Sequence, residues 1–166
     1  MTFHQPQMVS TMFLRICTIL MGLFLMLSAS APAQAQVNII QVQKLQFGKW
    51  HFGDNSSAVT ITVSPTGVIN SNSPNITMLT PPTPGIYNIN GLPAFAPIND
   101  VVVLVGLPMQ MGADQFTLNN FTTNIADADG LGNTQLRLGA DLVTSGDNQI
   151  YPGGTYDGEI SIEIVY

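Results

Sequence analysis

Few side chains in this sequence could do acid–base or nucleophilic chemistry. His51 is the only histidine after residue 35, and the single cysteine, Cys17, lies within the first 35 residues. A catalytic Cys/His pair and a zinc site both need several such residues, so neither is expected in residues 36–166. No Gly-x-Ser-x-Gly motif, phosphate-binding glycine loop or dinucleotide fingerprint occurs there. We therefore predict that the protein is not an enzyme and that it has no cofactor and no metal.

Two pairs of carboxylates could still serve glycoside hydrolysis, which needs only two acids at a suitable separation. One pair is Asp127 with Asp129, and the other is Glu159 with Glu163. The first pair lies among turn-forming residues, and the second alternates with isoleucines as on the solvent face of a strand. Structural roles therefore explain both pairs better than catalysis does.

The segment Asp127-Ala128-Asp129-Gly130 resembles part of a calcium loop, in which closely spaced oxygens and a glycine surround the cation. In an EF-hand register the first and last ligand positions would fall on Ile125 and Leu136, which have no carboxylate. A turn with Asx-type hydrogen bonds explains the segment without a metal. Trp50 and His51 could form an exposed aromatic contact, but packing at a strand end explains them better.

The first 35 residues have the pattern of a secretory signal peptide. Arg15 precedes an apolar run over residues 16–27, and Ala33-Gln34-Ala35 is a typical cleavage site. The run is shorter than the roughly 20 residues that span a bilayer. An uncleaved anchor and a lipoprotein modified at Cys17 are alternatives, but Cys17 opens the apolar run instead of following it. We predict a cleaved signal peptide at residues 1–35 and a secreted protein, in the periplasm, on the outer surface or in a fimbrium of a bacterium.

Residues 36–166 form, on this interpretation, a single mature domain. The domain has no cysteine, so burial and backbone pairing must hold it together without a disulfide. Lys44, Lys49 and Arg137 stand against ten acidic residues, which gives a net charge of −7. Nucleic acid and anionic membranes are poor partners for such a surface. The mature part also contains no apolar run that could span a membrane.

Apolar residues of the mature part alternate with period two, and no segment keeps a helical apolar stripe for three turns. The pattern predicts an all-β domain, with antiparallel strands arranged as a sandwich. Glycine, proline, asparagine, aspartate and serine clusters separate eight predicted strands. These strands are residues 37–47, 58–63, 75–79, 86–90, 101–105, 115–124, 135–143 and 156–166.

The last predicted strand is the most regular, and the first is the least. In the last strand one face is polar apart from Val165, so the other face is predicted to be buried. The buried face comprises Tyr156, Gly158, Ile160, Ile162, Ile164 and Tyr166. The first strand changes phase twice, which predicts a β-bulge or a passage from one sheet to the other.

The C-terminal segment GGTYDGEISIEIVY (153–166) resembles that of pilus subunits assembled by the chaperone–usher route. In those subunits a glycine lies twelve residues before a terminal or penultimate tyrosine, and here Gly154 stands twelve residues before Tyr166. Earlier in the chain, LQFG (45–48), VTITV (59–63), GIYNING (85–91) and LGADL (138–142) resemble an uncharacterised family of secreted bacterial β-domains related to such pilins. The resemblance covers about residues 40–166. It implies an immunoglobulin-like, pilin-like sandwich and an extracellular structural role.

The resemblance also implies how subunits would join. A pilin lacks one strand beside its final strand, and the N-terminal extension of the next subunit fills the gap by donor-strand complementation. In this sequence the donor residues would be Val37, Ile39 and Val42. The acceptor residues would lie in the C-terminal strand, at Gly154, Tyr156, Gly158, Ile160, Ile162, Ile164 and Tyr166.

We therefore expect a structural or adhesive subunit of a bacterial surface fibre. Its implied partners are identical or related subunits and a periplasmic chaperone. Because of the phase changes, residues 37–47 could instead be a native first strand that completes the sandwich. The alternative function is then a self-contained secreted or periplasmic β-sandwich that binds a ligand without polymerising.

Overall fold

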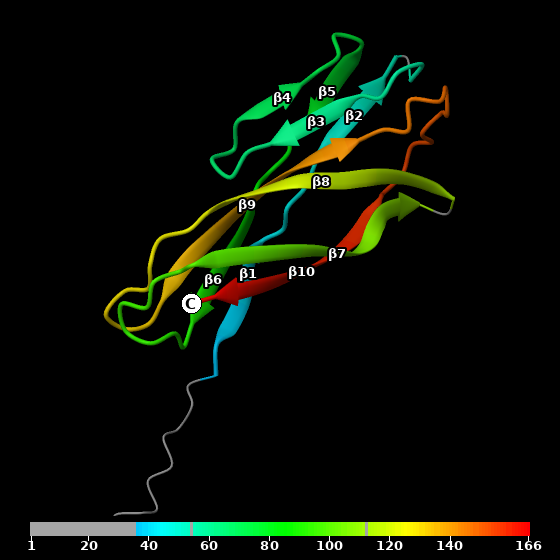
Figure 1. Cartoon of the computed structure of the whole chain (residues 1–166). Helices are drawn as coiled ribbons and strands as arrows, with labels where there is room; N and C mark the ends of the chain where they lie inside the picture. Colours follow the sequence, from blue (N-terminus) through cyan, green and yellow to red (C-terminus); the bar gives the residue numbers. More distant parts are fainter. Residues whose placement is uncertain (1–35, 54, 112) are drawn as a thin grey trace, which may run out of the picture. The chain divides into compact units, whose positions relative to one another are not determined.

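The computed structural model describes residues 36–53, 55–111 and 113–166 (Figure 1). The predicted signal peptide, residues 1–35, lies outside the described residues. Within the described part every regular element is a β-strand, and no helix is long and apolar enough to cross a membrane. The strands are β1 (Asn38–Gln43), β2 (Lys49–Phe52), β3 (Thr60–Val63), β4 (Ile69–Ser71), β5 (Ile76–Thr80), β6 (Gly85–Asn90), β7 (Asp100–Met111), β8 (Asp114–Asn124), β9 (Thr134–Val143) and β10 (Asp157–Val165).

A continuous path of paired strands runs in the order β1-β6-β9-β8-β7-β10. β9 pairs with β8 and also with β6 and β3, and β4 pairs with β3. β2 and β5 form a separate two-stranded sheet. All of these pairs are antiparallel, which confirms the predicted all-β, antiparallel class.

The β7–β8 hairpin opens to create two layers. β7 and β8 pair only between residues 109–111 and 114–116. Beyond this stretch β8 follows β9, whereas β7 follows β10 (Figure 1). Isoleucines of β10 pack against the same apolar cluster as Leu136 and Leu138 of β9, so the two layers share one core. The predicted sandwich-like arrangement is confirmed.

Two apolar clusters form the core of the domain. The first cluster includes Ile89, Leu136 and Leu138, and the second includes Ile61 and Val63. None of these five side chains has any exposed surface. Burying each of them contributes about 1.5–3 kcal/mol to the free energy of folding.

All eight predicted strands are present, with some changes in their bounds. The structure adds the short strands β2 and β4 and extends the strand predicted at 101–105 to Met111. β1 ends at Gln43, and its pairing with β6 shifts between Gln41 and Gln43, which confirms the predicted bulge. β10 ends at Val165. The prediction that Gly158 and Tyr166 belong to the buried face is wrong, because Gly158 is exposed and Tyr166 lies beyond the last pair with 48% of its surface exposed.

Candidate functional site

A groove of about 1050 Å³ runs between β10 and the segment that links β1 to β2. Gln41 and residues 44–50 contribute to one wall, and residues 151–160 with Ile162 contribute to the other. We call this hollow the β10 groove. Side chains from the core strands also line it, namely Tyr87, Met109, Phe116, Leu118 and Leu142. The groove is therefore apolar inside and joins segments that lie more than a hundred residues apart in the sequence.

β10 has a strand neighbour on one side only. It pairs with β7, and no Cα atom of β1 lies within 8 Å of a Cα atom of β10. Paired strands are separated by about 4.8 Å, so the gap between β1 and β10 is too wide for pairing. Among the strands of the described residues, none covers this second edge of β10.

Two hydrogen bonds show which backbone groups of β10 face β7. The carbonyl oxygen of Val165 accepts from the backbone N–H of Asn99 at 2.8 Å, so the carbonyl of Val165 points toward the β7 side. The backbone N–H of Val101 donates to the carboxylate of Asp100 at 2.8 Å. Val101 is opposite Ile164. This pair is therefore one of the antiparallel pairs that exchange no backbone hydrogen bonds.

The same alternation determines the direction of the other backbone groups. The pairing of β10 with β7 continues without a shift from Ile160 to Val165. Because bonded and non-bonded pairs alternate, Ile160, Ile162 and Ile164 direct their N–H and C=O groups to the open edge. Their side chains are half-buried and pack against the first core cluster. The open edge thus offers backbone hydrogen-bonding groups beside an apolar groove.

Four aromatic rings pack together beside the start of β10. Phe116 stacks on Tyr151, with ring centroids 4.2 Å apart, and meets Tyr156 edge-on at 4.8 Å. Phe52 lies 6.1 Å from Phe116. Burial raises the pKa of the Tyr156 hydroxyl, and the nearby negative charge of Asp114 raises it further by a smaller amount. This part of the groove wall is therefore formed by mutually packed rings before any ligand binds.

The two walls of the groove carry opposite charges. Lys44 and Lys49 are exposed on one wall, and their side chains make no ion pair or hydrogen bond with the residues that the structure describes. Asp157 and Glu159 lie on the other wall. The remaining basic residue of the described part, Arg137, is exposed on β9 and does not line the groove.

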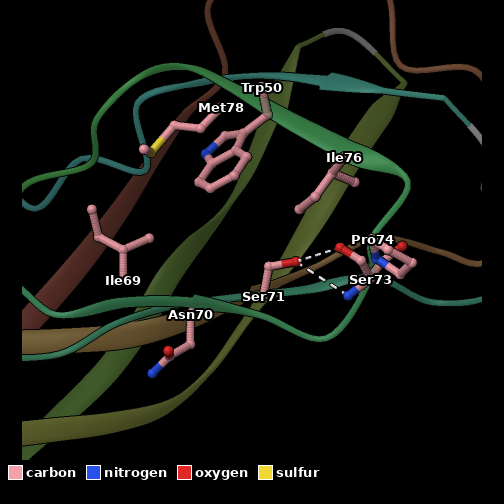
Figure 2. Close-up of a pocket in the computed structure, with 8 residues that line it drawn as sticks. All are labelled: Trp50, Ile69, Asn70, Ser71, Ser73, Pro74, Ile76 and Met78. Atoms are coloured by element: carbon pink, nitrogen blue, oxygen red, sulfur yellow. Dashed lines mark hydrogen bonds between the residues drawn. The ribbon is translucent and has the colours of Figure 1, made fainter.

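A second, shallower hollow of about 320 Å³ lies between the β2–β5 sheet and the β3–β4 hairpin (Figure 2). The indole N–H of Trp50 donates to the carbonyl oxygen of Phe47, which fixes the ring. The hydroxyl of Ser71 donates to the carbonyl oxygen of Ser73 at 3.0 Å, and Asn70 points to the other side of its strand (Figure 2). No ionisable side chain is among the lining residues, which are Trp50, Ile69, Asn70, Ser71, Ser73, Pro74, Ile76 and Met78. The hollow is therefore lined by neutral side chains only.

The first carboxylate pair considered for glycoside chemistry holds a turn together. Asp127 accepts a hydrogen bond from the backbone N–H of Ile98 at 3.0 Å. Asp129 accepts from the N–H groups of Asn133 and Leu131, both at 2.8 Å. Both bonds lower the pKa of Asp129, and the bond from Asn133 has the larger effect. The predicted turn with Asx-type hydrogen bonds is confirmed.

The other candidate residues lie apart from one another. Glu159 and Glu163 are exposed on β10, and His51 is exposed on β2. In the described ranges no group of three or more His, Cys, Asp or Glu side chains is arranged to hold a metal ion. The groove, rather than any cluster of titratable groups, is therefore the candidate functional site.

The predicted donor residues lie in or beside the first strand of the chain's own sheet. β1 pairs with β6, and Val37 and Ile39 are half-buried against the first core cluster. Val42 lies at the bulge and is 57% exposed. The structure therefore shows the native first strand that was considered as an alternative. A closed sandwich would require β1 to pair with the last strand, β10. In this structure β1 pairs with β6 instead.

Sequence reasoning found one wall of the groove and missed the other. Five predicted contact residues line it, namely Gly154, Tyr156, Gly158, Ile160 and Ile162, whereas Ile164 and Tyr166 do not. The missed residues include Lys44, Leu45, Phe47, Lys49 and Tyr151. A signal existed for Leu45 and Phe47, because the second phase change of the first predicted strand returns them to the side of Val37. The lysines gave no signal, since the sequence does not show which segments face each other.

Comparison with known proteins gives one informative result. No curated protein and no solved structure matches the chain. Residues 37–166 match the family described as "Domain of unknown function (DUF4402)". This match agrees with the expected relation to an uncharacterised family, and the relation to pilus subunits stays a prediction. Since the matched region covers nearly all of the described residues, the chain belongs to the DUF4402 family.

Proposed function

We propose that this protein is a secreted, pilin-like subunit of a bacterial surface fibre, with a structural or adhesive role, and that its β10 groove accepts a β-strand from another chain. The observation that carries the proposal is the open edge of β10 beside an apolar groove. Recognition by strand addition uses these two features together. Main-chain hydrogen bonds supply affinity, and pockets for alternate side chains supply specificity.

The groove offers enough interaction energy for such an association. The backbone groups of Ile160, Ile162 and Ile164 can form several hydrogen bonds, each worth about 1 kcal/mol net. Each apolar side chain that the incoming strand buries would add about 2 kcal/mol. Three or four such side chains would offset much of the roughly 4–15 kcal/mol that association costs in lost freedom of motion.

An open edge also needs a partner for a second reason. An unpaired, apolar strand edge promotes uncontrolled aggregation unless something covers it. A related subunit or a periplasmic chaperone would supply the covering strand. The predicted signal peptide supports a location outside the cytoplasm.

Sedimentation of the purified protein over a range of concentrations tests the proposal. We expect the protein to bind a peptide with valine at alternate positions when this peptide is added in excess, and any oligomer that the protein forms alone to dissociate in its presence. Ile162→Pro, which removes an N–H from the open edge, should weaken peptide binding relative to Ile162→Ala, which loses the same side chain but keeps the N–H. Monomers at every concentration, together with no binding of the peptide, would refute the proposal.

A self-contained binding domain is the second candidate function. It is favoured by the pairing of β1 with β6 in the same chain, which leaves no strand of the described part free to be donated. This candidate predicts a stable monomer whose β10 edge takes up no peptide, so the same sedimentation experiment separates the two.

A further inference from the structure

The positive charge of the domain is concentrated at one wall of the β10 groove. Residues 36–166 contain ten acidic and only three basic side chains, and two of the three basic ones, Lys44 and Lys49, line the groove. Both are exposed and pair with none of the described carboxylates. They are therefore available to a carboxylate on whatever occupies the groove.

The opposite wall restricts where an acidic side chain of the occupant can lie. Asp157 and Glu159 would lie along the other side of an inserted strand, where they would oppose its acidic side chains and attract its basic ones. Opposite charges on neighbouring strands stabilise a sheet, and like charges directly opposite destabilise it. Carboxylates of the occupant are therefore favoured only at positions beside Lys44 and Lys49. The lysine wall gives the groove a charge that most of the surface lacks.

β1 of a second copy matches this groove poorly. Residues 36–43 contain no charged side chain, so they offer nothing to Lys44 and Lys49. In its own chain β1 is paired with β6, and Ile39 packs against the core. Donating β1 to a neighbour would require breaking these contacts, and the groove would return no ion pair in exchange.

We infer that the occupant of the β10 groove is a strand of a different polypeptide, apolar at alternate positions and carrying carboxylates beside Lys44 and Lys49. The inference rests on the proposed function and adds to it the charge and the source of the partner strand. It assigns Lys44 and Lys49 a role in selecting the partner, distinct from the apolar surface that holds it.

Labelled peptides with one apolar face and three different polar faces test the inference. All three carry valine at alternate positions, and the two polar positions nearest Lys44 and Lys49 are both glutamate, both serine or both lysine, with serine at the other polar positions. A fourth peptide is residues 36–43 of this chain. Binding to the full chain is measured by fluorescence anisotropy. We expect the glutamate peptide to bind about tenfold more tightly than the serine peptide, from two cross-strand ion pairs, and the lysine peptide to bind most weakly.

Two variants connect the preference to the lysines. In the Lys44→Gln/Lys49→Gln double variant the glutamate and serine peptides should bind within about twofold of each other. Arg137→Gln is the control, because it removes a positive charge from a residue outside the groove, one charge where the double variant removes two. It should leave the tenfold preference unchanged. Raising the salt to about 0.5 M should reduce the preference of the parent protein, since these groups are exposed to solvent.

The outcomes separate the inference from the proposed function. Equal binding of the three designed peptides, or tightest binding of the lysine peptide, would overturn the assigned charge while strand addition itself stands. Tightest binding of residues 36–43 would identify a second copy as the partner and overturn the assigned source. If none of the four peptides binds, strand addition and the inference both fail.

Discussion

Proline substitutions at two neighbouring positions of β10 test which edge of this strand is open. Proline removes a backbone N–H, which a strand tolerates only where that group faces solvent. The alternation of backbone groups directs the N–H of Glu163 toward β7 and the N–H of Ile162 toward the groove. Glu163→Pro should therefore destabilise the fold, whereas Ile162→Pro should add little to the loss of the isoleucine side chain.

The expected magnitudes follow from the contacts of the two residues. Glu163→Pro breaks a hydrogen bond worth about 1 kcal/mol and leaves an acceptor on Val102 unpaired, which costs about 1–3 kcal/mol more. We expect a total of about 3 kcal/mol relative to Glu163→Ala. Ile162 is half-buried, so Ile162→Ala should cost about 2 kcal/mol, near the lower end for a core residue. Ile162→Pro should stay within about 1 kcal/mol of Ile162→Ala.

Urea unfolding of the four variants provides the measurement. The fluorescence of Trp50 is a suitable signal, because it is the only tryptophan and packs against the second core cluster. Each proline variant is compared with the alanine variant at the same position, so that the side-chain contribution cancels. Equal losses at the two positions would refute the assignment of the open edge, and a larger loss at Ile162 would reverse it.

Three further predictions concern the core, the turns and the acid range. Leu136→Ala removes a side chain with no exposed surface from the first core cluster and should lower the free energy of unfolding in urea by about 2–5 kcal/mol; a loss below 1 kcal/mol would contradict the assigned core. Gly48 has a φ of +72°, and an added Cβ would lie 2.1 Å from the carbonyl oxygen of Thr80. Gly67 has a φ of +84° with nothing within 4 Å of such a Cβ, so Gly67→Ala should cost only about 1 kcal/mol for the left-handed backbone, and Gly48→Ala should lower the melting temperature clearly more. The pKa of Asp129 is lowered in the folded state, so its stabilising contribution is complete above about pH 4 and is lost as the pH falls through that lowered pKa. Asp129→Ala should therefore be less stable than the parent at neutral pH but lose less stability on acidification, and parallel pH curves for the two proteins would contradict this reasoning.

Alternation of apolar residues was sufficient to predict β9 and β10. The isoleucines of β10 were assigned to one buried face from their spacing alone, and the structure confirms that they pack against the first core cluster. The same pattern located β9, whose Leu136 and Leu138 are completely buried. These predictions succeed because a strand with one face in the core must repeat its apolar residues with period two.

The short and irregular strands could not be predicted in this way. β2 and β4 have only four and three residues, too few for an alternation to be recognised. β7 continues through Gly106 and Pro108, which usually mark turns. It can do so because its pairing with β10 shifts on both sides of Glu159, so bulges absorb these residues.

The groove could be predicted only in part, because it depends on contacts between distant segments. Alternation predicted that Ile160 and Ile162 face inward, but it gave no information about the strand on their other side. The open edge of β10 exists because β1 pairs with β6, and this pairing depends on tertiary packing. Sequence patterns describe each segment by itself, whereas a groove is a property of two segments together.

The second layer of the described fold has only two strands, and this affects how the protein is exposed during its synthesis. β7 and β10 are its members, and β10 follows the other nine described strands along the chain. While the nascent chain is still growing on the ribosome and β10 has not been made, the side of the first core cluster that β10 covers is exposed. Aggregation and proteolysis therefore threaten a chain that is interrupted before β10 more than one that contains it. Concealment of the core thus depends on the synthesis of this strand.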